Sequence, residues 1–141
     1  MKYIKLYETG EWCNYVDLDY VKKHPDDDSE EANWIKYLNN TLESIIEDLE
    51  DPNTFEIIDI KGFDTYQGPY AKVRIFDTKY SIWTIANDND LWIENFPIDN
   101  TGSNNSKSGY QGTDFEIACL LNDINNSGGI DVYLNTKKYN L

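Results

Sequence analysis

The stretch that decides the fold is residues 70–86, YAKVRIFDTKYSIWTIA. In its first half apolar side chains alternate with charged ones, namely Ala71, Val73 and Ile75 with Lys72 and Arg74. This period of two predicts a strand with one buried and one exposed face. A tight connection at Asp77-Thr78 leads to residues 79–86, which are apolar on both faces. We therefore expect an antiparallel hairpin whose second strand is central in its sheet.

Short apolar runs separated by polar turns predict further strands on both sides of this hairpin. They cover residues 55–60 and 91–98 beside the hairpin, and residues 3–7 and 130–134 near the two ends. Together these runs predict an antiparallel β-sheet, a meander of about four strands plus N- and C-terminal strands.

Two amphipathic helices are expected to pack on this sheet, at about 29–50 and 114–125. The first has an apolar stripe at spacings of three and four, formed by Ile35, Leu38, Leu42, Ile45 and Leu49. Asp28 or Ser29 can cap it, and Thr113 with Glu116 forms a capping box for the second helix. Two heptads are too few for a coiled coil, so the pattern predicts a single α+β domain over residues 1–141.

Residues 99–112, DNTGSNNSKSGYQG, are predicted to form a long flexible loop. A polar segment of this length is uncommon in a compact domain, and such loops often carry function. Two interpretations stay open: a flexible hairpin connection, or a loop that contacts a partner through Tyr110.

The composition excludes several classes of function. The chain has 26 Asp and Glu against 12 Lys and Arg, a net charge of −14, and its one arginine is Arg74. Because so few Lys and Arg side chains cannot neutralise a row of phosphates, direct nucleic-acid binding is not expected. No apolar run has the length of a signal peptide or membrane span, which favours a cytoplasmic protein without a membrane partner. Cys13 and Cys119 are expected to be half-buried free thiols.

No motif indicates an enzyme, a metal or a cofactor. The only histidine, His24, precedes a proline and an acidic run and has no neighbouring nucleophile motif. Ser106-Lys107-Ser108 lacks the glycine of a phosphate-binding loop, and Asn87–Asp90 lacks the glycine and the glutamate of a calcium loop. We therefore expect a non-enzymatic protein without catalytic residues.

The negative charge is concentrated in one part of the chain. Residues 17–59 contain 14 acidic and three basic residues, a net of −11 of the total −14. Such a segment either keeps a small protein soluble or forms a face that binds a basic protein. For the second interpretation the expected partner-binding residues are Asp26, Asp27, Asp28, Glu30, Glu31, Glu43, Glu47, Glu50, Asp51 and Tyr110.

In length, acidity and lack of cofactor motifs the chain is similar to small phage- or mobile-element-encoded inhibitors of bacterial defence, such as anti-restriction and anti-CRISPR proteins. This similarity lies in composition and implies no residue roles. It implies an inhibitor, acting in the cytoplasm of a host bacterium, that blocks the basic surface of a nucleic-acid-processing protein, as a partial DNA mimic or by charge alone. Two alternatives remain open: an immunity protein that neutralises a cationic toxin, and a protein that sequesters a small ligand.

Overall fold

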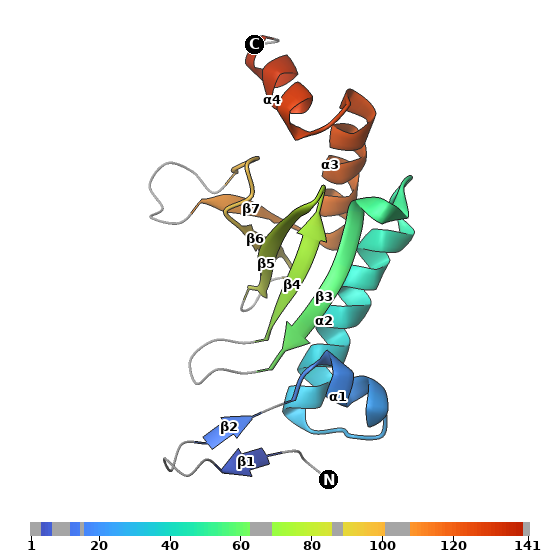
Figure 1. Cartoon of the computed structure of the whole chain (residues 1–141), viewed down its shortest axis with the longest axis vertical. Helices are drawn as coiled ribbons and strands as arrows, with labels where there is room; N and C mark the ends of the chain where they lie inside the picture. The colour runs from blue at the N-terminus through green and yellow to red at the C-terminus, as the bar shows by residue number, and fades with distance from the viewer. Residues whose placement is uncertain are drawn as a thin grey trace.

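The computed structural model describes residues 4–6, 12–14, 16–62, 69–85, 89–100 and 108–139. Its centre is a five-stranded antiparallel sheet in the order β3-β4-β5-β6-β7 (Figure 1). The strands are β3 (Phe55–Lys61), β4 (Tyr70–Ile75), β5 (Thr78–Thr84), β6 (Leu91–Glu94) and β7 (Gly109–Gly112). The predicted meander is confirmed, and the strand expected to be central, β5, lies in the middle of the sheet.

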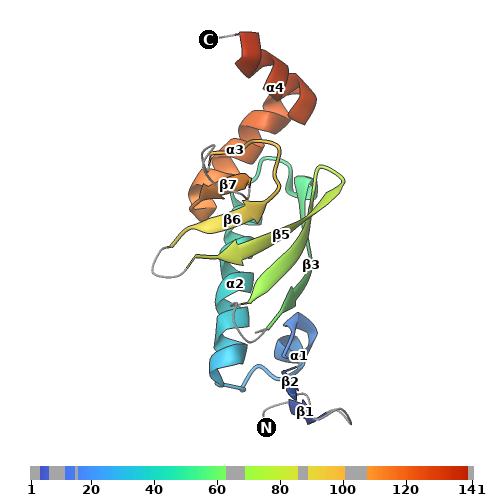
Figure 2. The same cartoon turned by 90° about the vertical axis from the view of Figure 1, so that its left-hand side faces the viewer.

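One face of this sheet is covered by helices. Helix α2 (Glu30–Glu47) crosses it, and α3 (Asp114–Ser127) packs beside α2. Figure 2, turned from Figure 1, shows the uncovered face of the sheet with α2 behind it. The side chains that fill the space between the two layers are fully buried, and they include Ile35, Leu38, Leu42, Val73, Ile82 and Ile93.

The ends of the two predicted helices follow from local hydrogen bonds. Ser29 is the N-cap of α2, and its hydroxyl accepts a bond from the Ala32 amide. Thr113 and Glu116 form the expected capping box of α3. Helix α3 ends at Gly128, which takes the left-handed conformation at φ +105°, where glycine carries no steric penalty.

The last four residues of the predicted long loop form β7 instead of loop. Gly109 permits this pairing, because a Cβ there would lie 2.3 Å from the Ile93 carbonyl oxygen. The outer edge of β7 is closed by Asn100, whose side-chain amide donates to the Gln111 carbonyl oxygen and accepts from its N–H, each at 2.7 Å. An asparagine side chain thus takes the place of a sixth strand. Residues 101–107 of the predicted loop lie outside the described residues.

The predicted C-terminal strand is wrong. Residues 130–134 begin α4 (Ile130–Tyr139), and Ile130 and Tyr133, three residues apart, pack against the core. Their short alternating pattern also fits one turn of a helix. Pairing with β7, the preceding strand in the sequence, is blocked because Asn100 occupies its outer edge.

The N-terminal strand forms but does not join the main sheet. It is β1 (Ile4–Leu6), which pairs with β2 (Trp12–Asn14) in a separate two-stranded sheet. A short helix, α1 (Leu18–Lys23), connects this hairpin to the body, and a 3₁₀ turn, Pro52–Thr54, precedes β3. The hairpin and α4 lie at opposite ends of the molecule (Figures 1 and 2).

We predict that Asn100→Ala opens the edge of β7. Both backbone groups of Gln111 lose their partner, and hydrogen exchange of the Gln111 amide should accelerate by about fivefold, which corresponds to one hydrogen bond of ~1 kcal/mol. Amide exchange followed by NMR measures this. Asn89→Ala, at an exposed asparagine, is the control, and equal Gln111 protection in both variants would contradict the role of Asn100.

Candidate functional site

The predicted acidic residues form two groups at opposite ends of α2. The N-terminal acidic group is Asp26, Asp27, Asp28, Glu30 and Glu31. The C-terminal acidic group consists of the predicted Glu43, Glu47, Glu50 and Asp51 together with Asp48, the C-cap of α2, which is not among the predicted residues. Because α2 has 18 residues, about 27 Å of helix separates its two ends. The tertiary structure therefore does not unite the predicted face into one continuous patch.

The N-terminal acidic group is largely explained by local structure. The Asp27 carboxylate accepts bonds from the Tyr20 hydroxyl at 2.6 Å and from the Ser29 amide at 2.8 Å. These bonds lower the pKa of Asp27 from 3.8 to about 2, with the Tyr20 hydroxyl as the largest cause. Glu30 and Glu31 lie in the first turn of α2, where they complement the positive end of the helix dipole.

A lysine closes the loop that carries this group. The Lys36 ammonium group donates to the carbonyl oxygens of Pro25 at 2.9 Å and Asp27 at 2.7 Å. Lys36, the basic residue of α2, thus binds the N-terminal loop and lies away from the C-terminal acidic group.

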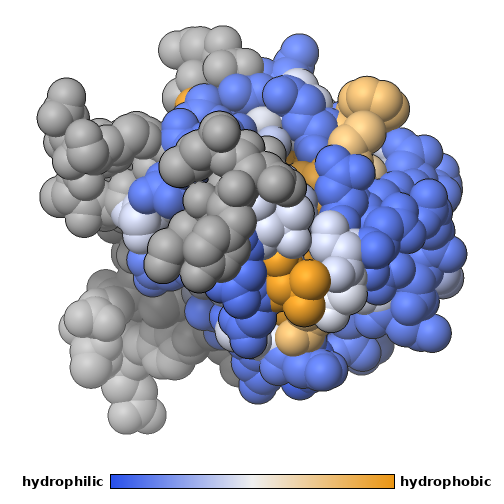
Figure 3. All heavy atoms as spheres, turned by 90° about the horizontal axis from the view of Figure 1, so that it is seen from above, coloured by the Kyte–Doolittle hydropathy of each residue, from blue (hydrophilic) through white to orange (hydrophobic). Residues whose placement is uncertain are grey.

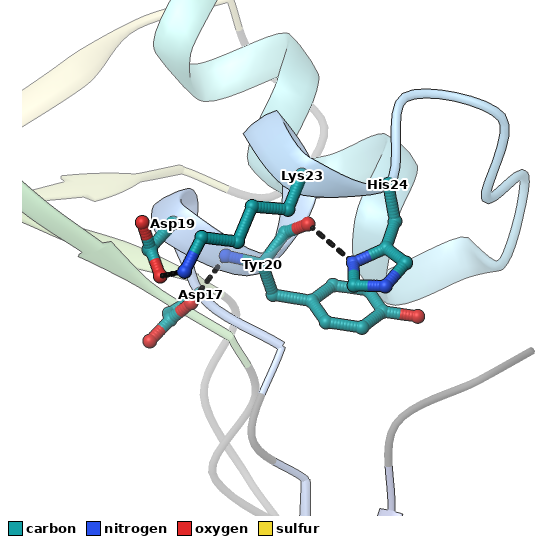
Figure 4. Close-up of polar contacts among 5 residues, drawn as sticks. All are labelled: Asp17, Asp19, Tyr20, Lys23 and His24. Atoms are coloured by element: carbon teal, nitrogen blue, oxygen red, sulfur yellow. Dashed lines mark hydrogen bonds and ion pairs between the residues drawn. The ribbon is translucent and has the colours of Figure 1, made fainter.

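Helix α1 holds the other side of this loop (Figure 4). Asp17 caps it by accepting from the Tyr20 amide at 2.8 Å, and Lys23 pairs with Asp19 at 3.1 Å. The His24 ring stacks on the Tyr20 ring at 4.3 Å, and its Nδ1 lies 3.0 Å from the Tyr20 carbonyl oxygen. His24 therefore takes part in the packing of the loop.

In the C-terminal acidic group only Asp51 has a comparable local role among the described contacts, because its carboxylate accepts from the Asn53 amide at 3.0 Å and caps the 3₁₀ turn. All five side chains are exposed, and the last turn of α2 contains no basic residue. No ion pair joins any of the five to a cation within the described part of the chain. The carboxylates also surround the negative end of the helix dipole, where a negative charge is unfavourable. This group costs stability in the free protein.

The position of this group is fixed by α3. The Asn122 side chain accepts from the Glu50 amide at 2.9 Å and donates to the Asp48 carbonyl oxygen at 3.0 Å. The side chain thereby satisfies backbone groups that the end of α2 leaves without helical partners. The acidic residues that follow α2 are therefore held in place. Pairing of Asn122 with this turn joins segments that are 72–74 residues apart, so no local sequence pattern indicates it.

Tyr110 does not lie in a loop. It belongs to β7, is half-buried and packs against the core. Burial raises its pKa, and the neighbouring Glu116 raises it further. Its placement favours a packing role over contact with a partner.

The uncovered face of the sheet carries a row of aromatic residues. Tyr70, Trp83, Trp92 and Gln111 are successive cross-strand neighbours on β4, β5, β6 and β7. Tyr70 and Trp83 stack with their ring centroids 4.7 Å apart. Beside the row is an open depression of about 680 Å³, lined by residues that include Ile58, Lys72, Ser81 and Glu94. Sequence analysis did not unite this row, because strand register decides which aromatic residues are adjacent.

Exposed apolar side chains lie at two further places. Trp34 and Tyr37 on α2 are 39% and 45% exposed, and their rings meet edge to face. Phe115 on α3 and Val132 and Leu134 on α4 are also exposed. Figure 3, which views the molecule from the α4 end, shows hydrophobic atoms among hydrophilic ones.

Cys119 is exposed on α3, contrary to the expectation of a half-buried thiol, and the Cys13 side chain is not among those described.

The described residues contain neither a candidate metal site nor a candidate membrane span. Among them, no three His, Cys, Asp or Glu side chains are grouped so that they could bind a metal ion. No helix in the same residues has the length and apolar character to cross a membrane. Comparisons with protein-family models, with curated proteins and with solved structures found no significant match.

We predict that Tyr20→Phe raises the pKa of Asp27 toward its ordinary value. In the native protein the pKa falls from 3.8 to about 2, so the Asp27 interactions stabilise the fold above pH 4 and are lost as pH falls through about 2. The variant should lose much of this pH dependence. A ¹³C NMR titration of the Asp27 carboxyl carbon measures it, with Tyr37→Phe at an exposed tyrosine as control. An unchanged titration in Tyr20→Phe would rule out the hydroxyl as the main cause.

We predict that Glu47→Lys stabilises the free protein by about 0.5–1 kcal/mol. The lysine complements the negative end of the dipole and pairs with Glu43 four residues earlier. Denaturant unfolding measures the change. Glu30→Lys, at the other end of α2, is the control and should destabilise the protein, because it places a cation at the positive end. A loss of stability in Glu47→Lys would show that the C-terminal acidic group is structural.

Proposed function

We propose that the protein is a non-enzymatic inhibitor that binds a basic surface of a nucleic-acid-processing protein through the C-terminal acidic group. The observation that carries this proposal is the placement of five exposed carboxylates at the negative end of α2, without an ion pair among the described residues. Charges that weaken the free protein become favourable once a cationic surface approaches them.

The rigid setting of the group supports binding. Asn122 holds the backbone of the turn after α2, so this backbone needs little ordering when a partner binds. Less conformational entropy is then lost on association. The negative field of the whole chain, with a net charge of −14, would also accelerate the encounter with a basic partner.

The spacing of the charges favours electrostatic blocking over close imitation of DNA. Duplex DNA carries one charge for every ~1.7 Å of its axis. The nearest members of the two acidic groups, Glu31 and Glu43, are separated by ~18 Å of helix without an acidic residue, which is far sparser. The C-terminal acidic group therefore acts in this proposal as a local competitor for cations that normally contact phosphates. In a host bacterium the action would be cytoplasmic.

Two alternative functions remain proposals for this protein. A cationic toxin as partner would make the protein an immunity protein, with the same acidic group in contact. The aromatic row and the depression beside it favour the other alternative, sequestration of a small ligand on the uncovered face. Binding of a small molecule by the chain alone would favour that alternative.

The test compares two variants of equal net charge. One neutralises the C-terminal acidic group by Glu47→Gln, Glu50→Gln and Asp51→Asn. The other neutralises the N-terminal acidic group by Asp26→Asn, Asp28→Asn and Glu30→Gln. Each loses three negative charges, so only the position of the change differs. Native protein and both variants are used to capture partners from a bacterial lysate, and the captured protein is identified and purified.

We expect a basic partner whose affinity falls about tenfold with the first variant and little with the second, because exposed ion pairs contribute ~0.2–1 kcal/mol each. Affinity should also fall with added salt. Equal effects of both variants would reduce the proposal to a general charge effect. Salt-independent binding, or a partner that is not basic, would overturn it.

A further inference from the structure

A pocket lies between α1, α2 and the outer edge of β3, next to the C-terminal acidic group. Its volume is about 410 Å³, which is enough for one long side chain with water. Leu18, Ile46 and Phe55 give it apolar walls, and Asn39 and Glu43 of α2 supply polar groups. Glu43 thus belongs both to the pocket and to the acidic group.

The edge of β3 leaves backbone groups directed to this pocket. The Phe76 amide donates to the Thr54 carbonyl oxygen at 3.1 Å, which makes this a hydrogen-bonded pair of the β3–β4 ladder. Antiparallel alternation then turns the N–H and C=O groups of Phe55 and Ile57 away from β4. No hydrogen bond to these outward groups is found in the described part of the chain.

Within the described residues, two contacts cover other parts of the sheet edge. Asn100 covers the edge of β7, and at the far end of β3 the Gly62 amide donates to the Val16 carbonyl oxygen at 2.9 Å. Neither contact covers the outward backbone groups of β3 beside the pocket, where Phe55 is buried and Ile57 is partly exposed.

Asn39 supplies a third acceptor. Its side-chain oxygen is buried and has no hydrogen-bond partner, and Asn39 lines the pocket. A buried oxygen without a partner is unfavourable in the free protein. In the free protein this oxygen is closed to a water-sized group, so the Asn39 side chain has to turn toward the pocket before a donor bound there removes the cost.

The charges of the pocket favour a cation. Glu43 and Asp77 oppose Lys22, and the remaining pair, Glu56 and Arg74, is joined at 2.5 Å. The wall thus has a net negative charge and already accommodates one guanidinium group. Lysine offers a compact ammonium group, whereas arginine presents five N–H donors in a plane and can reach several separated acceptors together.

We propose that this pocket receives an arginine side chain of the basic partner. The inference rests on the proposed function and adds to it which residue of the basic partner the protein recognises. The guanidinium group donates to the Glu43 carboxylate and to the outward carbonyl oxygen of Ile57, and a turn of the Asn39 side chain brings its oxygen to a further donor.

The experiment titrates the ¹⁵N-labelled full chain with N-acetyl-arginine-N-methylamide and follows amide shifts by NMR. The matched probe is the citrulline analogue, which has a similar shape and no charge. We expect saturable shifts at the Asn39 side-chain amide and at the amides of Phe55 and Ile57. Citrulline should bind about tenfold more weakly, since hydrogen bonds to a charged group are stronger.

Asn39→Leu should abolish these shifts while its midpoint of thermal unfolding stays equal or rises, because the variant removes a buried oxygen without a partner. Asn40→Leu, at the next and exposed position of α2, should bind the probe normally. Equal binding of arginine and citrulline, unchanged binding by Asn39→Leu, or shifts confined to other acidic residues would overturn the proposal. Stronger shifts of the same amides with inorganic phosphate would assign the pocket to an anion and also overturn it.

The outcomes for the pocket and for the proposed function can be separated. The lysate partner's affinity for the Glu47, Glu50 and Asp51 triple variant tests the acidic group, and that variant leaves Glu43 and Asn39 intact. If this affinity falls and the arginine probe does not bind, the proposed function stands and the arginine pocket is wrong. If the probe binds and the triple variant keeps full affinity, the pocket stands and the acidic group is not the main contact.

Discussion

The packing of the apolar stripe of α2 on one face of the sheet is the contact on which the rest of the structure depends. Ile35, Leu38 and Leu42 are fully buried against strand residues such as Val73 and Ile82. Each buried side chain of this kind contributes ~1.5–3 kcal/mol, far more than any exposed ion pair in the molecule. Once this face is buried, the opposite face of α2 must lie in solvent together with its charges.

This orientation explains why the two acidic groups differ. At the beginning of α2 the helix dipole, Lys36 and the bonds to Asp27 all favour negative charge. At the end of α2 the dipole disfavours negative charge, and Asn122 holds the turn in place without neutralising it. The same residue type is therefore part of the local structure at one end and a source of instability at the other. For this reason the proposed binding surface is the C-terminal acidic group.

Local sequence patterns were sufficient to predict an element where a single rule of helix or strand formation applies. The alternation around Val73, the capping box at Thr113 and the stripe of α2 each predicted an element that the structure confirms. Prediction failed where two rules compete within a few residues. Residues 130–134 fit both a strand and a helix turn, and the structure forms the helix. Asn100 blocks the outer edge of β7, the preceding strand, through a contact with Gln111 across 11 positions that no periodicity indicates.

The sequence by itself determined the class of fold, the central hairpin and the concentration of charge in residues 17–59, because these depend on residue type and on spacing along the chain. Tertiary structure decided how that charge is divided, that Tyr110 packs in a strand, and that Asn39, Glu43 and the edge of β3 border one pocket. These features depend on distances between segments remote in the chain. Such distances are set by the packing of α2 on the sheet and by strand register, which the order of residues does not display directly.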